Sequence, residues 1–204
     1  MKNTPLLSEP EPLHELIEAL TALPGVGKRT ARRMAYHLLQ YDRDAAQQIG
    51  LSIDKALHEL KHCRLCNSFT TEDICAICSS SRRNHRLLCV VETAADLNMI
   101  EASHSYHGLY YVLMGRISPL EGVGGKSLGF ERLLQRVEDY PVDEVILATN
   151  FTAEGETTAH YLGQVLRERG IKVSRIARGV PSGSELEYVD AGTIAWALTE
   201  RRGQ

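Results

Sequence analysis

Four of the five cysteines stand in two pairs whose spacing is that of metal ligands. Cys63 and Cys66 form one C-x2-C pair, and eight residues separate it from the second pair, Cys75 and Cys78. Each pair lets two sulfurs reach one ion from a tight turn, and four thiolates complete a tetrahedral shell around Zn²⁺ with no open position for water. In a reducing compartment, such clustering favours a metal over disulfides. The sequence therefore predicts one structural zinc ion per chain.

A glycine turn, Leu23-Pro24-Gly25-Val26-Gly27-Lys28, forms a second candidate site between two helical patterns. Gly25 and Gly27 permit a tight turn and leave backbone N–H groups uncovered. The next helix begins here, so its free N–H groups and positive dipole end can hold a phosphate without reading a base. Further positive charge comes from Lys28, Arg29, Arg32 and Arg33. We expect these six residues to bind DNA through its backbone; the alternative is an ordinary helical hairpin with a solvated basic face.

Carboxylates follow two apolar runs of strand type. Glu92 comes directly after Val90-Val91, and Val145–Ala148 precedes a segment that contains Asn150, Thr152, Glu154 and Glu156. Because the carboxyl ends of parallel strands converge on one crevice, we expect these side chains to lie together. Two carboxylates beside neutral Asn150 and Thr152 make a weak site for a hard cation and leave metal-assisted cleavage short of charge. We predict no catalytic residue here, and leave open whether Glu92 and Glu154 bind Mg²⁺ or form a structural or partner-contacting pair.

Two Gly-Lys pairs fail the Walker A pattern, Gly-x4-Gly-Lys-Ser/Thr. Gly27-Lys28 has Ala22 at the first glycine position and Arg29 at the last position. Gly125-Lys126-Ser127 ends correctly, but Leu120 occupies the first glycine position. We therefore predict no nucleotide-binding loop.

The elements that must position these residues follow from periodicity. A polar tail, residues 1–12, precedes a helical region, 13–60, and a short turn-rich segment, 61–84, that holds the cysteine pairs. Residues 85–178 alternate between strands and helices. Strands are expected at 87–91, 109–114, 145–148 and 171–176, and helices at 94–101, 130–137, 157–169 and, after this region, 191–201. This alternation predicts an α/β fold with a mainly parallel sheet covered on both faces.

The bulk composition is that of a globular protein, with 43% hydrophobic and 24% charged residues. No apolar run approaches the roughly 20 residues of a membrane helix, and the N-terminal segment does not have the pattern of a secretory signal. We therefore expect a cytoplasmic protein with no membrane partner. The net charge of -3 does not exclude DNA as a partner, because affinity depends on local clusters.

The motifs, taken in order, resemble a known family. Leu23–Ala31, LPGVGKRTA, resembles the helix-hairpin-helix of DNA repair proteins, and Glu92 with the segment after Val145–Ala148 resembles the Toprim domain, with Asn150 and Thr152 in place of two aspartates. The order helix-hairpin-helix, four-cysteine zinc finger and Toprim domain resembles the RecR family of recombination mediators. Two departures from that pattern are Phe151, where proline is expected, and Gly125-Lys126-Ser127, where an acidic segment is usual.

The resemblance implies a non-catalytic, nucleoid-associated clamp in RecF-pathway DNA repair. Such a protein would bind single-stranded, double-stranded and gapped DNA, work with RecO and RecF, and help RecA displace single-strand-binding protein. It would form a homo-oligomer, a tetrameric ring or a dimer, in which the Walker B-like segment 179–204 serves assembly. The alternatives are a magnesium-dependent Toprim nuclease or primase-like enzyme, and a scaffold that binds only proteins.

Overall fold

The computed structural model describes residues 9–125 and 128–201, and the chain divides into two compact units at Leu60/Lys61. Residues 1–8 of the expected tail, and the Lys126-Ser127 pair of the rejected Walker A match, lie outside the described residues. Among the helices that are described, none combines the length and the apolar character needed to cross a bilayer.

The N-terminal unit contains three helices, α1 (Glu11–Thr21), α2 (Lys28–Gln40) and α3 (Arg43–Glu59). Helices α1 and α2 form a hairpin around Ile17, Ala31 and Ala35, since small alanines on α2 let the two helices approach closely. Helix α1 begins at Glu11, two residues before the expected helical region. Pro12 suits its first turn, because a backbone N–H at that position would have no acceptor within the helix.

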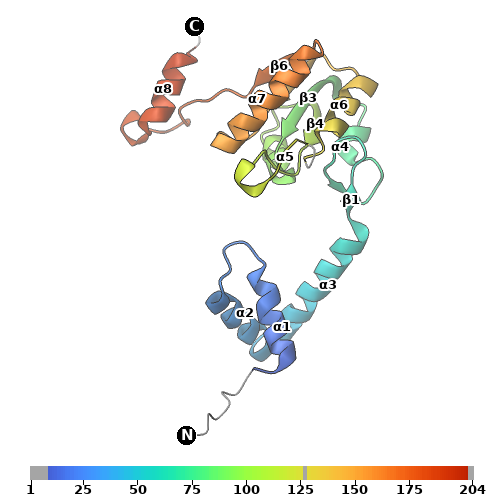
Figure 1. Ribbon diagram of the computed structural model, residues 1–204, viewed down its shortest axis with the longest axis vertical. Helices are drawn as coiled ribbons and strands as arrows, with labels where there is room; N and C mark the ends of the chain where they lie inside the picture. The colour runs from blue at the N-terminus through green and yellow to red at the C-terminus, as the bar shows by residue number, and fades with distance from the viewer. Residues whose placement is uncertain (1–8, 126–127, 202–204) are drawn as a thin grey trace. The chain divides into compact units, whose positions relative to one another are not determined.

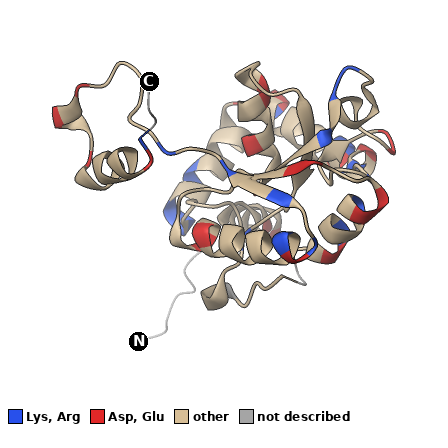
Figure 2. Cartoon of the chain, turned by 90° about the horizontal axis from the view of Figure 1, so that it is seen from above, with Lys and Arg blue, Asp and Glu red and all other residues tan. Residues whose placement is uncertain are grey.

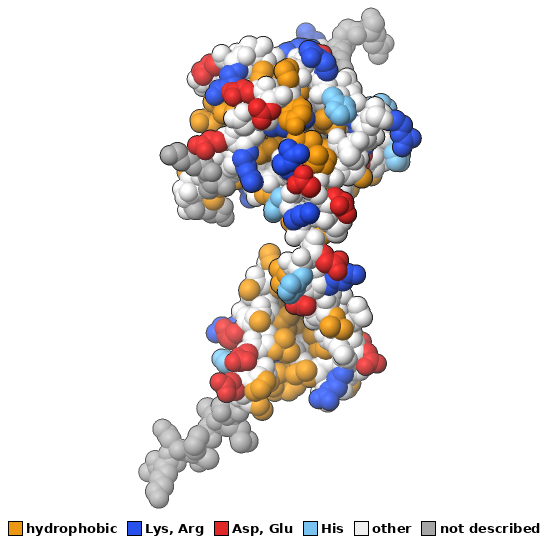
Figure 3. All heavy atoms as spheres, turned by 90° about the vertical axis from the view of Figure 1, so that its right-hand side faces the viewer, with side chains coloured by type: hydrophobic (Ala, Val, Ile, Leu, Met, Phe, Trp, Pro, Cys, Tyr) orange, Lys and Arg blue, Asp and Glu red, His pale blue; other side chains and the backbone are white. Residues whose placement is uncertain are grey.

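Helix α3 contacts α2, yet none of its residues, all of which are described, is buried. Large apolar side chains are exposed instead, and they gather over this unit in Figure 3. On α3 and directly after it, these side chains are Ile49, Leu51, Ile53, Leu57 and Leu60. We refer to these five residues as the α3 apolar face.

The segment with the cysteines is small. An antiparallel hairpin of β1 (Lys61–His62) and β2 (Phe69–Thr70) is followed by the single-turn helix α4 (Ala76–Ser79). Two hydrogen bonds attach this zinc module to the sheet: Asn67 Nδ2 donates to the Val112 carbonyl, and the Val112 amide donates to the Cys66 carbonyl, both at 2.8 Å.

Four strands form a parallel sheet in the order β4-β3-β5-β6. Their bounds are β3 (Asn84–Val91), β4 (Gly108–Val112), β5 (Glu144–Leu147) and β6 (Lys172–Arg175). The strands in the middle are apolar runs because both faces are covered. Cys89 of β3 is buried there, and burial raises the pKa of its thiol to about 12.

Helices cover both faces of this sheet (Figure 1). Helices α6 (Phe130–Asp139) and α7 (Ala153–Glu168) pack on one face, and α5 (Ala94–Ala102) packs on the other. Strand β4 lies on one side of β3, and the next strand along the chain, β5, lies on the other side. The strand order therefore reverses between β3 and β5. Ligand sites of α/β sheets lie at such a switch point. The fold class predicted from the sequence is confirmed.

Helix α7 begins four residues earlier than the expected start at Thr157. Thr152 is its N-cap, and the hydroxyl accepts a hydrogen bond from the Gly155 amide at 3.1 Å. Glu154 and Glu156 therefore lie in the first turn of a helix, where carboxylates complement the helix dipole.

Short helical turns occupy the remaining connections. η1 (Pro119–Glu121) lies between β4 and α6, and η2 (Leu186–Tyr188) precedes the last helix, α8 (Ala191–Thr199). Asp190 caps α8 by accepting from the Thr193 amide at 2.9 Å.

Candidate zinc centre and nucleic-acid interface

The four paired cysteines converge on one point. Their Sγ atoms all lie within 4.8 Å of one another, close enough to surround one ion with zinc–sulfur bonds of about 2.3 Å. Cys63, Cys66 and Cys78 are buried, and Cys75 is partly buried. The cluster has the donor type, number and proximity of a structural tetrathiolate site, and it fits one zinc ion.

Local backbone structure holds these sulfurs in place. Cys63 and Cys66 flank a turn in which the Asn67 amide donates to the Cys63 carbonyl at 2.9 Å, and Asn67 itself adopts a positive φ of 62°. The Cys75 amide donates to Cys63 Sγ at 3.3 Å and so links the two cysteine pairs. Hydrogen bonds with Cys66 raise the pKa of Cys78 and lower that of Cys75, so the metal-free cluster retains protons that zinc displaces on binding.

The turn between α1 and α2 exposes backbone donors. Gly25 has a φ of 77°, which a glycine adopts without strain, whereas Gly27 is extended and is the N-cap of α2. No side chain forms a capping hydrogen bond with this helix. The first backbone amide of the helix that has an acceptor is that of Ala31, which donates to the Gly27 carbonyl at 2.9 Å. The preceding amides, those of Lys28, Arg29 and Thr30, are left to an outside acceptor. A phosphate is the kind of group that such a terminus binds.

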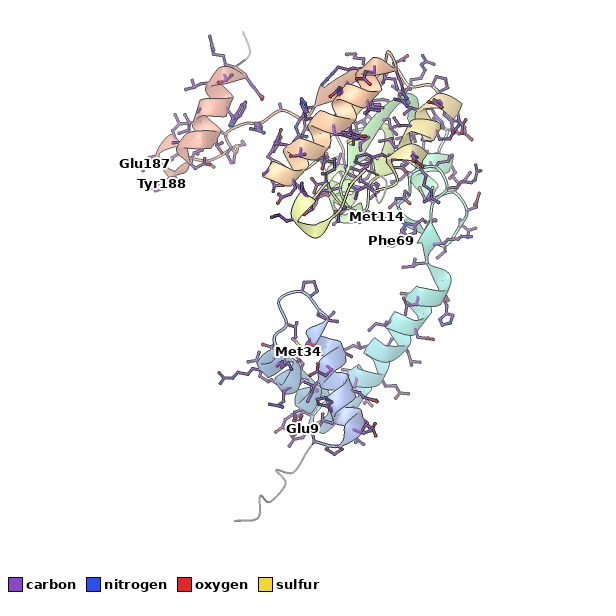
Figure 4. All side chains as sticks on the ribbon, viewed as in Figure 1. Glu9, Met34, Phe69, Met114, Glu187 and Tyr188 are labelled. Atoms are coloured by element: carbon purple, nitrogen blue, oxygen red, sulfur yellow. The ribbon has the colours of Figure 1, made fainter. Side chains whose placement is uncertain are left out.

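The four cations beside this turn form two rows with i,i+4 spacing, and the rows differ. Lys28 Nζ lies 3.6 Å from Glu18, and Arg32 Nε donates to Glu9 at 2.9 Å; Glu9 is labelled in Figure 4. Arg29 and Arg33 are exposed and, in the described part of the chain, have no acidic partner. Positive charge without an acidic partner among the described residues is therefore concentrated in the Arg29/Arg33 row.

Elsewhere, Figure 2 shows Lys and Arg interspersed with Asp and Glu over the α/β unit. The Arg29/Arg33 row of α2 thus differs in local charge pattern from the α/β unit, and the net charge of -3 does not reveal it.

At the switch point, Glu92 and Asn150 are joined to each other. Glu92 is 1% exposed, and its carboxylate accepts from the Asn150 amide and from Asn150 Nδ2, both at 2.8 Å. Arg116 Nη1 lies 4.0 Å from the same carboxylate. The glutamate that could hold a metal therefore fixes the turn after β5.

Close packing at this turn requires Gly155. A side chain there would come within 2.1 Å of the Asn150 carbonyl oxygen and within 2.7 Å of Glu92 Oε1. Thr149 strengthens the same contact, because its hydroxyl donates to the Gly155 carbonyl at 2.8 Å. The first turn of α7 thus lies directly against the end of β5.

The remaining residues predicted for the crevice differ in their contacts. Thr152 is exposed, and its hydroxyl caps α7. Glu154 is partly buried, and none of the described side chains forms a hydrogen bond or ion pair with its carboxylate. Glu156 accepts from Arg175 at 2.7 Å and from Arg178. Burial raises the pKa of Glu156, but the two arginines outweigh this and hold it below its usual value.

Several residues of this region escaped the sequence analysis. Arg178 lies between the rings of Phe151 and Trp196, 4.5 Å and 4.2 Å from their centroids. Arg175 donates to carbonyl groups at the end of β5 and also lies over Phe151. The available signal was a pair of arginines, Arg175 at the end of a strand and Arg178 three residues later. Its link to Glu156 is a long-range contact, and spacing does not encode it.

Comparison with known protein families divides the chain into four matches. Residues 13–57 match the helix-hairpin-helix of RecR, residues 60–80 the four-cysteine zinc finger domain of RecR, and residues 179–202 the C-terminal part of RecR. Residues 86–177 match the Toprim domain. Together the matches span nearly all of the chain in the expected order. The chain therefore belongs to the RecR family, whose domains support a role as recombination mediator in DNA repair.

Proposed function

We propose that the chain is a non-catalytic DNA-binding mediator of RecF-pathway repair. The observation that carries this proposal is the start of α2, where uncapped amides lie beside the unpaired Arg29/Arg33 row. Such a site binds phosphates of single-stranded, double-stranded or gapped DNA without reading bases, so its affinity depends on salt. Gly25, Gly27, Lys28 and Arg32 complete the proposed contact.

The absence of catalysis is part of the proposal. The Glu92 carboxylate is engaged by both amides of Asn150, and the position two residues on, Thr152, is neutral and caps a helix. A Toprim nuclease or primase-like enzyme needs acidic oxygens free to bind Mg²⁺ at this place. These contacts favour a structural crevice over a magnesium-dependent one.

Family membership supports a proposal about partners. We propose that the protein works with RecO and RecF, and through them helps RecA replace single-strand-binding protein on gapped DNA at the nucleoid in the cytoplasm. Glu154, in the first turn of α7, offers a carboxylate without a partner among the described side chains. We propose Glu154, with its neighbour Glu156, as a contact for these proteins.

Assembly accounts for the exposed apolar surfaces. The α3 apolar face and, in the C-terminal part, Leu186, Tyr188 and Leu198 leave more apolar surface exposed than a monomer needs. We propose that the segment 179–204 and the α3 apolar face of the DNA-binding region 13–60 join copies into a tetrameric ring or a dimer. The zinc finger 61–84 and the Toprim domain 85–178 complete each copy. Several weak DNA contacts then act together through effective concentration.

The two rows of α2 provide a matched test. We would measure binding to gapped and single-stranded DNA over a range of salt concentrations for an Arg29→Ala/Arg33→Ala double variant and for a Lys28→Ala/Arg32→Ala double variant. The first should lose at least tenfold in affinity at low salt, and the slope of log K against log salt should fall by about 2.

The second variant removes the same number of charges from the same helix, but those charges already contact Glu18 and Glu9. Its loss should be clearly smaller. Equal DNA affinity for the wild type and the Arg29/Arg33 variant would instead support the scaffold that binds only proteins.

A further inference from the structure

Arg136 occupies a core position of α6. Its neighbours on the inward face, Leu133 and Val137, belong to the main hydrophobic core, and Arg136 itself is 6% exposed. Burying a guanidinium costs free energy unless an opposite charge lies close to it. An arginine at this place therefore requires a partner of negative charge.

The visible contacts of Arg136 do not provide one. Nη1 donates to the Tyr140 carbonyl at 3.2 Å, and the guanidinium lies 4.7 Å from the centre of the Tyr140 ring. Nε is buried without a hydrogen-bond partner, and no described carboxylate forms an ion pair with this side chain. These contacts are neutral and leave the charge unbalanced.

A cavity separates Arg136 from the zinc module, and residues of both line it. Cys63 and Arg136 both line this cavity, together with Tyr111 of β4. Burial lowers the pKa of Arg136, and the strongest opposing influence comes from Cys78. Arg136 thus lies within electrostatic reach of the cysteine cluster from the α6 side.

The zinc site, in turn, carries buried negative charge that a nearby cation would balance. Four thiolates around one Zn²⁺ carry two excess negative charges, and three of these cysteines are buried. The other cations around the cavity are exposed: Arg64 pairs with Asp73 at 3.1 Å, and Arg132 lies on the solvent side of α6.

We propose that Arg136 is a positioning residue of the zinc centre, whose buried charge balances the zinc tetrathiolate and couples metal binding to the packing of α6 on the sheet. Groups outside the ligand set commonly tune a metal site in this way. The inference rests on the zinc site and is independent of DNA binding.

The same cavity could instead bind an anion, since Arg64, Arg132 and Arg136 all line it. Two carboxylates, Asp73 and Asp139, line it as well, and the occupied zinc site adds two further negative charges. With these charges counted, the surroundings do not favour an anionic ligand. Binding of inorganic phosphate is therefore an outcome of the test that would contradict the proposal.

The test compares three variants of the full chain: Arg136→Met, which keeps the length but removes the charge, Arg136→Lys, which retains a charge, and Arg132→Met, the matched control one turn earlier. Zinc affinity is measured by competition with a chelator. Arg136→Met should weaken zinc binding by about 10- to 100-fold. Arg136→Lys should recover most of this loss, and Arg132→Met should match the wild type.

Thermal unfolding with and without zinc gives a readout that a merely structural role would not produce. Arg136→Met should lower the melting temperature of the zinc-bound protein but leave unchanged or raise that of the zinc-free protein, which lacks the zinc tetrathiolate. Equal losses in both forms would mean that Arg136 only fills space. Wild-type zinc affinity in Arg136→Met, or saturable phosphate binding abolished by it, would overturn the proposal.

Discussion

The zinc module and the Toprim crevice both gather side chains that can bind metals, but they differ in what those side chains already contact. In the zinc module, four sulfurs point at one another and have few competing partners. In the crevice, Glu92 is engaged by Asn150, and Glu156 is engaged by Arg175 and Arg178. A cluster of donor types becomes a metal site only when its donor atoms remain free. The difference between the cysteine cluster, which fits zinc, and the crevice, whose Glu92 and Glu156 carboxylates are engaged, thus lies in the contacts of the donor atoms.

The largest expected effect is on the zinc module. Cys66→Ser should abolish stoichiometric zinc binding and lower the free energy of unfolding by about 3 kcal/mol or more, because metal binding contributes directly to folding. Metal analysis and thermal unfolding should show loss of the zinc module before the α/β core. Cys89→Ala, which also removes a buried thiol, should keep one zinc per chain. Full zinc content in Cys66→Ser would remove Cys66 from the ligand set.

A smaller effect is expected when the crevice is made more like a metal site. Asn150→Asp replaces a donor to Glu92 with a second carboxylate and should cost about 2–4 kcal/mol. Added Mg²⁺ should restore part of this loss in chemical denaturation. Asn150→Ala loses the same hydrogen bond without adding charge, so its smaller loss should not respond to Mg²⁺. A magnesium-independent result for Asn150→Asp would mean that the crevice cannot hold the ion at all.

Reversing the charge of Glu154, whose carboxylate has no partner among the described side chains, should weaken protein binding and not DNA binding. Glu154→Lys should weaken RecO or RecF binding by about tenfold, equivalent to about 1.4 kcal/mol, and leave DNA affinity within about twofold. Calorimetry with the purified partners would measure this. Glu131→Lys, at the corresponding first turn of α6, is the control. Unchanged partner affinity for Glu154→Lys would remove Glu154 from the proposed contact.

The smallest effect concerns the junction between the zinc module and the sheet. Arg83 Nη1 donates to Glu101 Oε1 at 2.9 Å, and Arg83 holds the pKa of Glu101 below its usual value. A lowered folded-state pKa stabilises the protein above about pH 4.3, and this stability is lost as the pH falls through the folded-state value. Glu101→Gln should flatten that acidic limb by less than about 1 kcal/mol. An unchanged pH profile would show that the pair is screened.

Local patterns predicted much of this architecture. Cysteine spacing located the zinc site, apolar runs located the strands, and the glycine turn located the start of α2. The early start of α7 was also accessible, since Thr152 followed by acidic residues is a helix-start signal.

Long-range pairing was not accessible in this way. Glu92 and Asn150 lie 58 positions apart, and Glu9 lies 23 positions from Arg32. Such contacts decide whether a charge is free, and they arise only when the chain has folded. Periodicity likewise predicts an inward position at 136 without predicting why an arginine occupies it.

The most direct test of the central claim is incubation of the wild-type protein with gapped DNA and Mg²⁺, with the bound fraction and the length of the DNA strands measured in the same sample. Because the start of α2 offers amides and arginines to phosphates, the protein should bind the DNA in a salt-sensitive manner. Because the Glu92 carboxylate is engaged by Asn150, every DNA strand should remain intact. Magnesium-dependent nicking that disappears in Glu92→Ala would contradict this account and show that the crevice is an active site.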